Sequence, residues 1–229
     1  MSMIGLILFL VLAVFPARGQ EAEGEDWVLP NRQAVRDQIR YGQALAPDLR
    51  TKMEVINRIT DMARSGGVSA EDAGTLRVLR YLAGEGTLLR RANGGPSGGG
   101  FPEARRASCA ALGYIGGKAS REILLDVLAA ETESLVLSQA VASLGKITDE
   151  PDDEVIRVFT LLLERKVLAG VGADSLTDAL LGAIGKLADS QSGIHDERLF
   201  RTLIRVLDAP LGPSLRRKTM LLLEKLKGF

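Results

Sequence analysis

Residues 102–116 read PEARRASCAALGYIG, and this stretch decides the fold because its pattern returns elsewhere in the chain. Leu112 and Ile115 form an apolar pair three residues apart, and Ala104 lies eight residues before the pair. Offsets of eight and eleven residues keep these positions on one face of an α-helix. The pattern recurs in SLVLSQAVASLGKI (134–147), DSLTDALLGAIGKL (174–187) and PSLRRKTMLLLEKL (213–226), and more weakly in DLRTKMEVINRI (48–59).

Other amphipathic helical patterns precede each of these copies. Several begin with acidic or hydroxylic capping residues and are bounded by Pro or Gly, as helices commonly are. The last four copies return after about 30 to 40 residues, an interval typical of helical repeat arrays. The sequence therefore predicts five helix pairs, whose first helices cover 32–45, 70–86, 120–130, 152–168 and 196–209.

The stretch 102–116 resembles the second helix of a HEAT repeat, in the short form also called bilin-lyase HEAT-like. The resemblance covers roughly residues 32–228 and is strongest over 102–147. It implies an all-α fold, namely an α-solenoid of about five HEAT-like helix pairs in an armadillo-like superhelix. The second helices would line its concave side. HEAT proteins are mostly scaffolds that bind proteins or peptides, with a few enzymes among them.

The first residues of the chain predict export. An apolar run from Met3 to Phe15 is shorter than the ~20 residues of a membrane span, and Ala17 and Gly19 precede Gln20 as small residues precede a cleavage site. We expect a signal peptide over 1–19 and a periplasmic or secreted mature chain with no stable membrane insertion. The alternative is an uncleaved N-terminal membrane anchor.

The mature chain is then expected to have two parts. An acidic linker covers 20–31, and the HEAT-like repeat domain covers 32–229, with a flexible Gly-rich loop at 93–100. The formal net charge of the whole chain is zero, which removes the global electrostatic case for nucleic-acid binding.

A Gly-Gly-Lys sequence at 116–118 invites comparison with a phosphate-binding loop. Such a loop needs Gly-x-x-x-x-Gly-Lys-Ser/Thr after a strand, whereas this chain has Leu112 and Ala119 at the outer positions and a helical pattern before them. The repeat explains the glycines instead. Gly116 and Gly117 end a helix.

Glycine recurs at one further position of the repeat, between the two apolar residues of three successive second helices (Gly113, Gly145 and Gly185). An interior helical glycine costs about 1 kcal/mol relative to alanine, so its recurrence predicts a close approach of the neighbouring helix. The last copy has Glu224 at this position, as expected of a polar cap on the final repeat.

The sequence contains no recognisable catalytic or metal-binding constellation. It has one cysteine and one histidine, Cys109 and His195, which lie far apart in the chain. Cys109 fits a buried apolar position in a helix. We therefore expect no cofactor, no metal and no enzymatic activity.

Basic residues occupy two kinds of position in the second helices. The family places an arginine near the helix start that braces the turns between repeats, and Arg50, Arg105 and Arg216 match it. Positions facing away from the apolar pairs carry the candidate site for a partner: a row of Tyr114, Lys146, Lys186 and Lys225, with Arg106 and Arg217 nearer the helix starts. Two interpretations of the lysines stay open: a groove for an acidic partner, or lysines that complement the helix dipoles.

The leading functional hypothesis is a non-catalytic exported HEAT-repeat scaffold that binds a protein or peptide partner through its concave face. Two rivals remain. One is a lyase-type or cofactor-handling protein of the bilin-lyase branch, and the other is a purely structural spacer in an envelope complex.

Overall fold

The computed structural model describes residues 28–88, 100–148, 153–168, 170, 174–190 and 193–227. Within these ranges all regular structure is helical and no strand occurs, which confirms the predicted all-α class. The expected signal peptide (1–19), residues 20–27 of the linker and residues 93–99 of the Gly-rich loop lie outside the described residues. No helix in these ranges combines the length and apolar character needed to cross a membrane.

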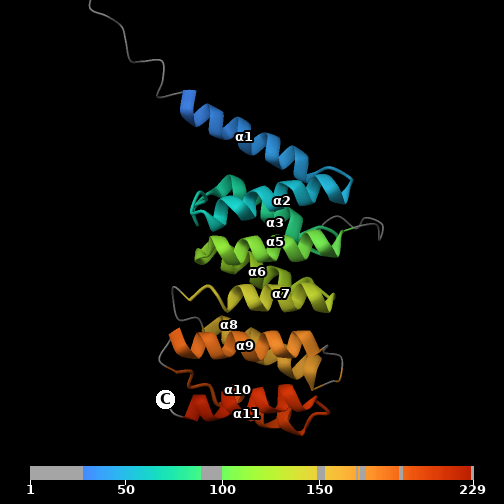
Figure 1. Ribbon diagram of the computed structural model, residues 1–229, viewed down its shortest axis with the longest axis vertical. Coiled ribbons are helices and arrows are strands. Elements are labelled where there is room, and N and C mark those ends of the chain that lie inside the picture. Colours follow the sequence, from blue (N-terminus) through green and yellow to red (C-terminus); the bar gives the residue numbers. More distant parts are fainter. Residues whose placement is uncertain are drawn as a thin grey trace, which may run out of the picture.

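Five helices, here called the front helices, lie one below another along the long axis in Figure 1. They are α2 (Leu49–Arg64), α5 (Pro102–Ile115), α7 (Ser134–Leu144), α9 (Asp174–Ser190) and α11 (Pro213–Lys227). These are the five copies of the repeated pattern. Each packs against the next in chain order, so the sequence repeat corresponds to a repeated helix–helix contact.

The remaining helices pack behind and above the front helices (Figure 1). The rear helices are α3 (Ala73–Gly84), α6 (Gly117–Ala130), α8 (Asp153–Leu162), which continues into a π-helical turn η1 (Leu163–Val167), and α10 (Glu197–Asp208). The first helix, α1 (Val28–Ala44), packs on α2 and α3. It begins four residues before the predicted start, with Pro30 in the first turn, where proline is tolerated.

Capping side chains and glycines set the helix boundaries, as the sequence indicates. The carboxylates of Asp48, Asp72 and Asp196 each accept a backbone N–H three residues later, at 2.7–3.1 Å, and so satisfy a free donor at a helix start. Gly116 and Gly117 have φ angles of 71° and 75° between α5 and α6, a conformation that favours glycine. Their predicted role as a helix end and turn is confirmed.

Small residues let the central front helices approach closely. A β-carbon at Gly113 would lie 2.7 Å from Cβ of Ser143 in α7, and one at Gly145 would lie 2.7 Å from Cβ of Ala183 in α9. Real β-carbons do not come so near, so the predicted close approach is confirmed at these two sites. At Gly185 it is wrong, because the nearest atom is Cδ1 of Leu222 at 3.8 Å. A large side chain there keeps α11 at ordinary contact distance.

One of the three predicted bracing arginines does brace the structure. Arg105 is buried and donates two hydrogen bonds to the buried Glu131 carboxylate, at 2.7 and 3.4 Å, across the end of α6. Glu131 also accepts the backbone N–H groups of Thr132 and Glu133, so this pair holds the turn into α7. The other two expectations are wrong, as Arg50 and Arg216 are exposed.

Their surroundings give the reason for the difference. Arg50 pairs only with Glu54, one turn along its own helix, and the side chain of Arg50 is 90% exposed. In α2 the buried cation is instead Lys52, which donates to the Ala44 carbonyl and to Glu85 at the end of α3, both at 2.8 Å. In both pairs a buried base on a front helix meets an acid that follows the next rear helix; Glu131 is buried, whereas the Glu85 side chain is 18% exposed.

The outer face of α11 is less polar than predicted. Glu224 is exposed as expected of a cap, but Met220 and Leu221 beside it are 50% and 59% exposed. The described stack therefore ends on an apolar surface with a polar rim.

The contrast between Gly145 and Gly185 gives a matched test of the helix contacts. We expect Gly145→Ala to lower the free energy of unfolding by about 1–3 kcal/mol, because Ala183 and its backbone leave no room. Gly185→Ala should raise the free energy of unfolding by up to about 1 kcal/mol, because the new β-carbon would make only an ordinary contact with Leu222 and alanine favours the helix. Urea denaturation followed by circular dichroism measures both. Equal changes at the two sites would contradict the packing described.

Candidate functional site

The predicted row of site residues lies at the C-terminal ends of successive front helices, a region here called the C-terminal edge. Tyr114 is in the last turn of α5, Lys146 follows α7, Lys186 is in α9 and Lys225 is in α11. The repeat places them at one register, and close packing of α5 and α7 brings Tyr114 and Lys146 into contact. The residues of this row differ in their exposure and in the groups that they contact.

Tyr114 lies between two cations. The Lys146 Nζ is 4.5 Å from the centre of the Tyr114 ring, and the Arg64 guanidinium carbon is 4.6 Å from it. Arg64, from the last turn of α2, also donates a hydrogen bond of 3.1 Å to the Tyr114 hydroxyl. The phenol remains 40% exposed. This cluster therefore presents two ordered positive charges and an aromatic ring to solvent.

The electrostatics of the cluster are those of an anion-binding surface. The hydrogen bond from Arg64, followed by the charge of Lys146, lowers the pKa of the Tyr114 hydroxyl from its usual value. Within the described residues, neither Arg64 nor Lys146 has a carboxylate within ion-pair distance. Both positive charges are thus available to an anionic group from outside.

The two other lysines of the row differ from each other. Lys186 is exposed and forms no hydrogen bond or ion pair with any residue that the structure describes. Lys225 is partly buried and contacts Asp189 at 2.5 Å and the Gly185 carbonyl at 3.0 Å. Lys225 thus connects α11 to the end of α9, and these contacts leave it less available to a partner than Lys146 or Lys186.

Arg106 and Arg217 do not join the C-terminal edge. They precede Tyr114 and Lys225 by eight residues on α5 and α11, which is about 12 Å along a helix axis. Both are exposed, and Arg217 lies beside Leu221 and Glu224 on the outer face of α11. The repeated sequence pattern predicted that Arg106 and Arg217 lie on the same helix face as Tyr114 and the lysines. It did not indicate how far along the helix they lie from those residues.

Arg64 is the residue that the sequence analysis missed. It lies beyond the end of the repeated pattern in α2, and fifty positions separate it from Tyr114. The only signal in the sequence is a basic residue in the last turn of a helix, where a cation also complements the dipole. Its stacking on an aromatic ring of the next front helix could not be read from that signal.

Cys109 and His195 occupy different environments. Cys109 is fully buried in α5, and burial raises the pKa of its thiol to about 12, so it stays protonated near neutral pH. His195 is exposed in the segment before α10. The described residues contain no group of three or more His, Cys, Asp or Glu side chains that could hold a metal ion.

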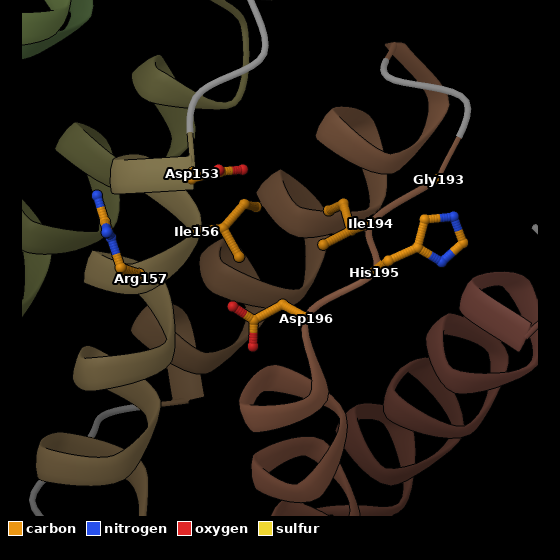
Figure 2. A pocket seen from close by; sticks show the side chains of 7 residues that line it. All are labelled: Asp153, Ile156, Arg157, Gly193, Ile194, His195 and Asp196. Carbon is orange, nitrogen blue, oxygen red and sulfur yellow. The ribbon is translucent and has the colours of Figure 1, made fainter.

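A hollow of about 490 Å³ lies between the start of α8 and the segment before α10. Figure 2 shows Ile156 and Ile194 facing each other across it, with Asp153 and Arg157 on the α8 side. Asp196 caps α10, while the His195 ring points away from the α8 residues (Figure 2). Among the described residues that line the hollow, the charged groups do not converge on one point.

Comparison with protein-family models and with curated proteins finds no match for this chain. The interpretation of the C-terminal edge therefore depends on its own geometry. That geometry is an exposed tyrosine held between two cations that have no carboxylate partner in the described part of the chain.

Tyr114 and Tyr81 provide a test of the cluster. We expect Tyr114 to lose its proton before Tyr81 in an alkaline titration, because Arg64 and Lys146 lower the pKa of the Tyr114 hydroxyl from its usual value near 10. Burial, together with the charge of Glu85, raises the pKa of Tyr81 to about 12, so its step should come late. Ultraviolet absorbance of the phenolate measures these steps.

Two variants assign the early step. Tyr114→Phe should remove it, and Arg64→Met should move it back towards pH 10. An early step that survives in Tyr114→Phe would show that the cluster is not formed as described.

Proposed function

We propose that this chain is a non-catalytic α-solenoid of about five HEAT-like helix pairs, exported to the periplasm or secreted, that binds an acidic segment of a partner protein. The proposed contact surface consists of Tyr114, Lys146 and Lys186 of the C-terminal edge, together with Arg64 in the last turn of α2. The stacking of front helices in chain order supports the solenoid, and the apolar run followed by small residues supports export.

The cluster around Tyr114 is the observation that carries this proposal. An exposed tyrosine is a frequent anchor in protein interfaces, because its ring gives contact area and its hydroxyl a hydrogen bond. Stacking of Arg64 and Lys146 on the ring orders both side chains before binding. Binding of a carboxylate to these ordered cations then costs less side-chain entropy than binding to mobile cations would.

The structure also bears on the alternative interpretation of the lysines. Lys225 behaves as a dipole-complementing lysine, since it contacts a carbonyl near the end of α9. Lys146 instead reaches the ring of Tyr114, and Lys186 has no partner among the described residues. Lys146 therefore supports an anion-binding role, whereas an exposed Lys186 without a described partner fits either interpretation.

Cofactor handling has weaker support. It would need a deep apolar hollow with polar groups that converge on a ligand. The hollow between α8 and α10 is open on one side and has charged side chains on its rim. We therefore rank an acidic protein segment above a cofactor.

A defined probe tests the proposal without knowledge of the natural partner. We expect a fluorescently labelled oligo-glutamate peptide to bind the full chain and to bind more weakly as salt rises, because exposed charges are screened beyond about 8–10 Å. The triple variant Arg64→Glu, Lys146→Glu, Lys186→Glu should weaken binding at least about tenfold, since each reversal replaces attraction with repulsion. Fluorescence anisotropy measures the affinity.

The matched control reverses the same amount of charge elsewhere. Arg106→Glu, Arg157→Glu and Arg216→Glu change exposed arginines that lie away from the C-terminal edge. Exposed substitutions typically change stability within about 0.5 kcal/mol each, so both triple variants should fold. If the control weakens binding as much as the edge variant, recognition depends on overall charge and the proposed surface is rejected.

A further inference from the structure

The outer face of α11 exposes positions that are covered in every earlier central front helix. Met220 has the register position of Cys109, Val141 and Leu181, each at most 2% exposed, yet Met220 itself is 50% exposed. Leu221, at 59%, has the position of Ala110, Ala142 and Gly182, which are partly covered. Where the earlier helices place small residues against the next helix, α11 places a leucine. This face has the composition of a helix–helix contact.

A shallow hollow of about 390 Å³ lies on this face. Leu211, Pro213, Met220 and Leu221 are the apolar residues that line it. Apolar side chains from an opposing helix would fill it and remove both exposed residues from water.

The charged residues on the outer face of α11 determine which partner could pack against it. Arg217, Leu221 and Glu224 follow a spacing of four and three residues, so they form one stripe along α11. Lys218 and Lys225 turn away from this stripe, because they pair with Asp178 and Asp189 of α9. Within the stripe, the positive Arg217 thus lies on one side of the apolar Leu221, and the negative Glu224 lies on the other side.

We infer that the occupant is a second copy of this chain, which packs its α11 antiparallel to the first. A two-fold axis between Met220 and Leu221 places each Met220 opposite the other copy's Leu221. The same axis places each Arg217 opposite the other copy's Glu224, so both ends of the contact gain an ion pair. A surface that complements itself in this way is what a two-fold symmetric interface requires.

The remaining charges near this face lie outside the proposed helix pairing. Arg216 also lines the hollow and is exposed, and it lies outside the stripe of Arg217, Leu221 and Glu224. Arg64, Tyr114, Lys146 and Lys186, which form the proposed contact surface, lie outside α11, so the proposed dimer leaves them free in both copies. Dimerisation is therefore a property separate from the proposed recognition of an acidic segment.

Sedimentation equilibrium of the full chain over a range of concentrations tests this inference. We expect a monomer–dimer equilibrium for the unmodified chain. Arg217→Glu should raise the dimer dissociation constant about tenfold or more, because symmetry creates two Glu–Glu contacts. Glu224→Arg should do the same through two Arg–Arg contacts.

An equimolar mixture of the two variants gives the sharpest result. The Arg217→Glu chain is acidic at both ends of the stripe, and the Glu224→Arg chain is basic at both ends. A heterodimer of the two should therefore form with an affinity near that of the unmodified chain. Arg106→Glu, at the equivalent register of α5, is the control and should leave dimerisation unchanged. Circular dichroism checks that every variant is folded.

Each other outcome overturns the inference. A chain that stays monomeric at all concentrations has no second copy on this face. A dimer that persists in both single variants, or two variants that remain monomeric when mixed, would show that α11 does not pair with itself in antiparallel register.

Discussion

The close approach of neighbouring front helices is the constraint on which the rest of the structure depends. Where Gly113 meets Ser143 and Gly145 meets Ala183, no bulky side chain separates the backbones of α5, α7 and α9. Protein interiors are close-packed, so such contacts leave little freedom for one helix to slide along another. Because the helices are held in register, their C-terminal ends align, and Lys146 of one repeat reaches the ring of Tyr114 in the preceding repeat. The proposed binding edge is thus a consequence of the small-residue contacts.

The two ends of the stack differ because different interactions hold them. Towards the N-terminus, the buried pair Arg105–Glu131 and the partly buried pair Lys52–Glu85 connect front helices to the ends of rear helices. Removal of one partner from such a pair leaves an uncompensated buried charge, so these contacts specify the arrangement strongly. Towards the C-terminus, Leu222 keeps α11 farther from α9, and more exposed pairs such as Lys218–Asp178 hold the last helix. The less tightly packed end also exposes the apolar face of α11.

Helix positions and the register of the small residues could be predicted from the sequence, because both follow from local periodicity. Gly113 and Gly145 make the expected contacts, whereas Gly185 does not, since the size of its neighbour Leu222 decides the distance. Long-range partners were the harder part. Arg50, Arg105 and Arg216 have equivalent positions in the repeated pattern. Of the three, only Arg105 reaches an acid that directly follows the next rear helix. Lys225 is neutralised by Asp189, and Arg64 joins Tyr114 from outside the repeated pattern. These pairings depend on how far one helix lies from the next.

Native-state hydrogen exchange tests most directly whether the central contacts hold the structure together. Segments with the strongest packing exchange only through global unfolding, whereas weakly packed ones open separately. The small-residue contacts predict that amides in α5, α7 and α9 exchange slowest, with free energies of opening equal to the global free energy of unfolding. Amides in α1 and α11 should exchange faster through local opening, measured at protein concentrations low enough to keep the chain monomeric. Protection of α11 equal to that of α7, or exchange of α5 before α11, would contradict this account.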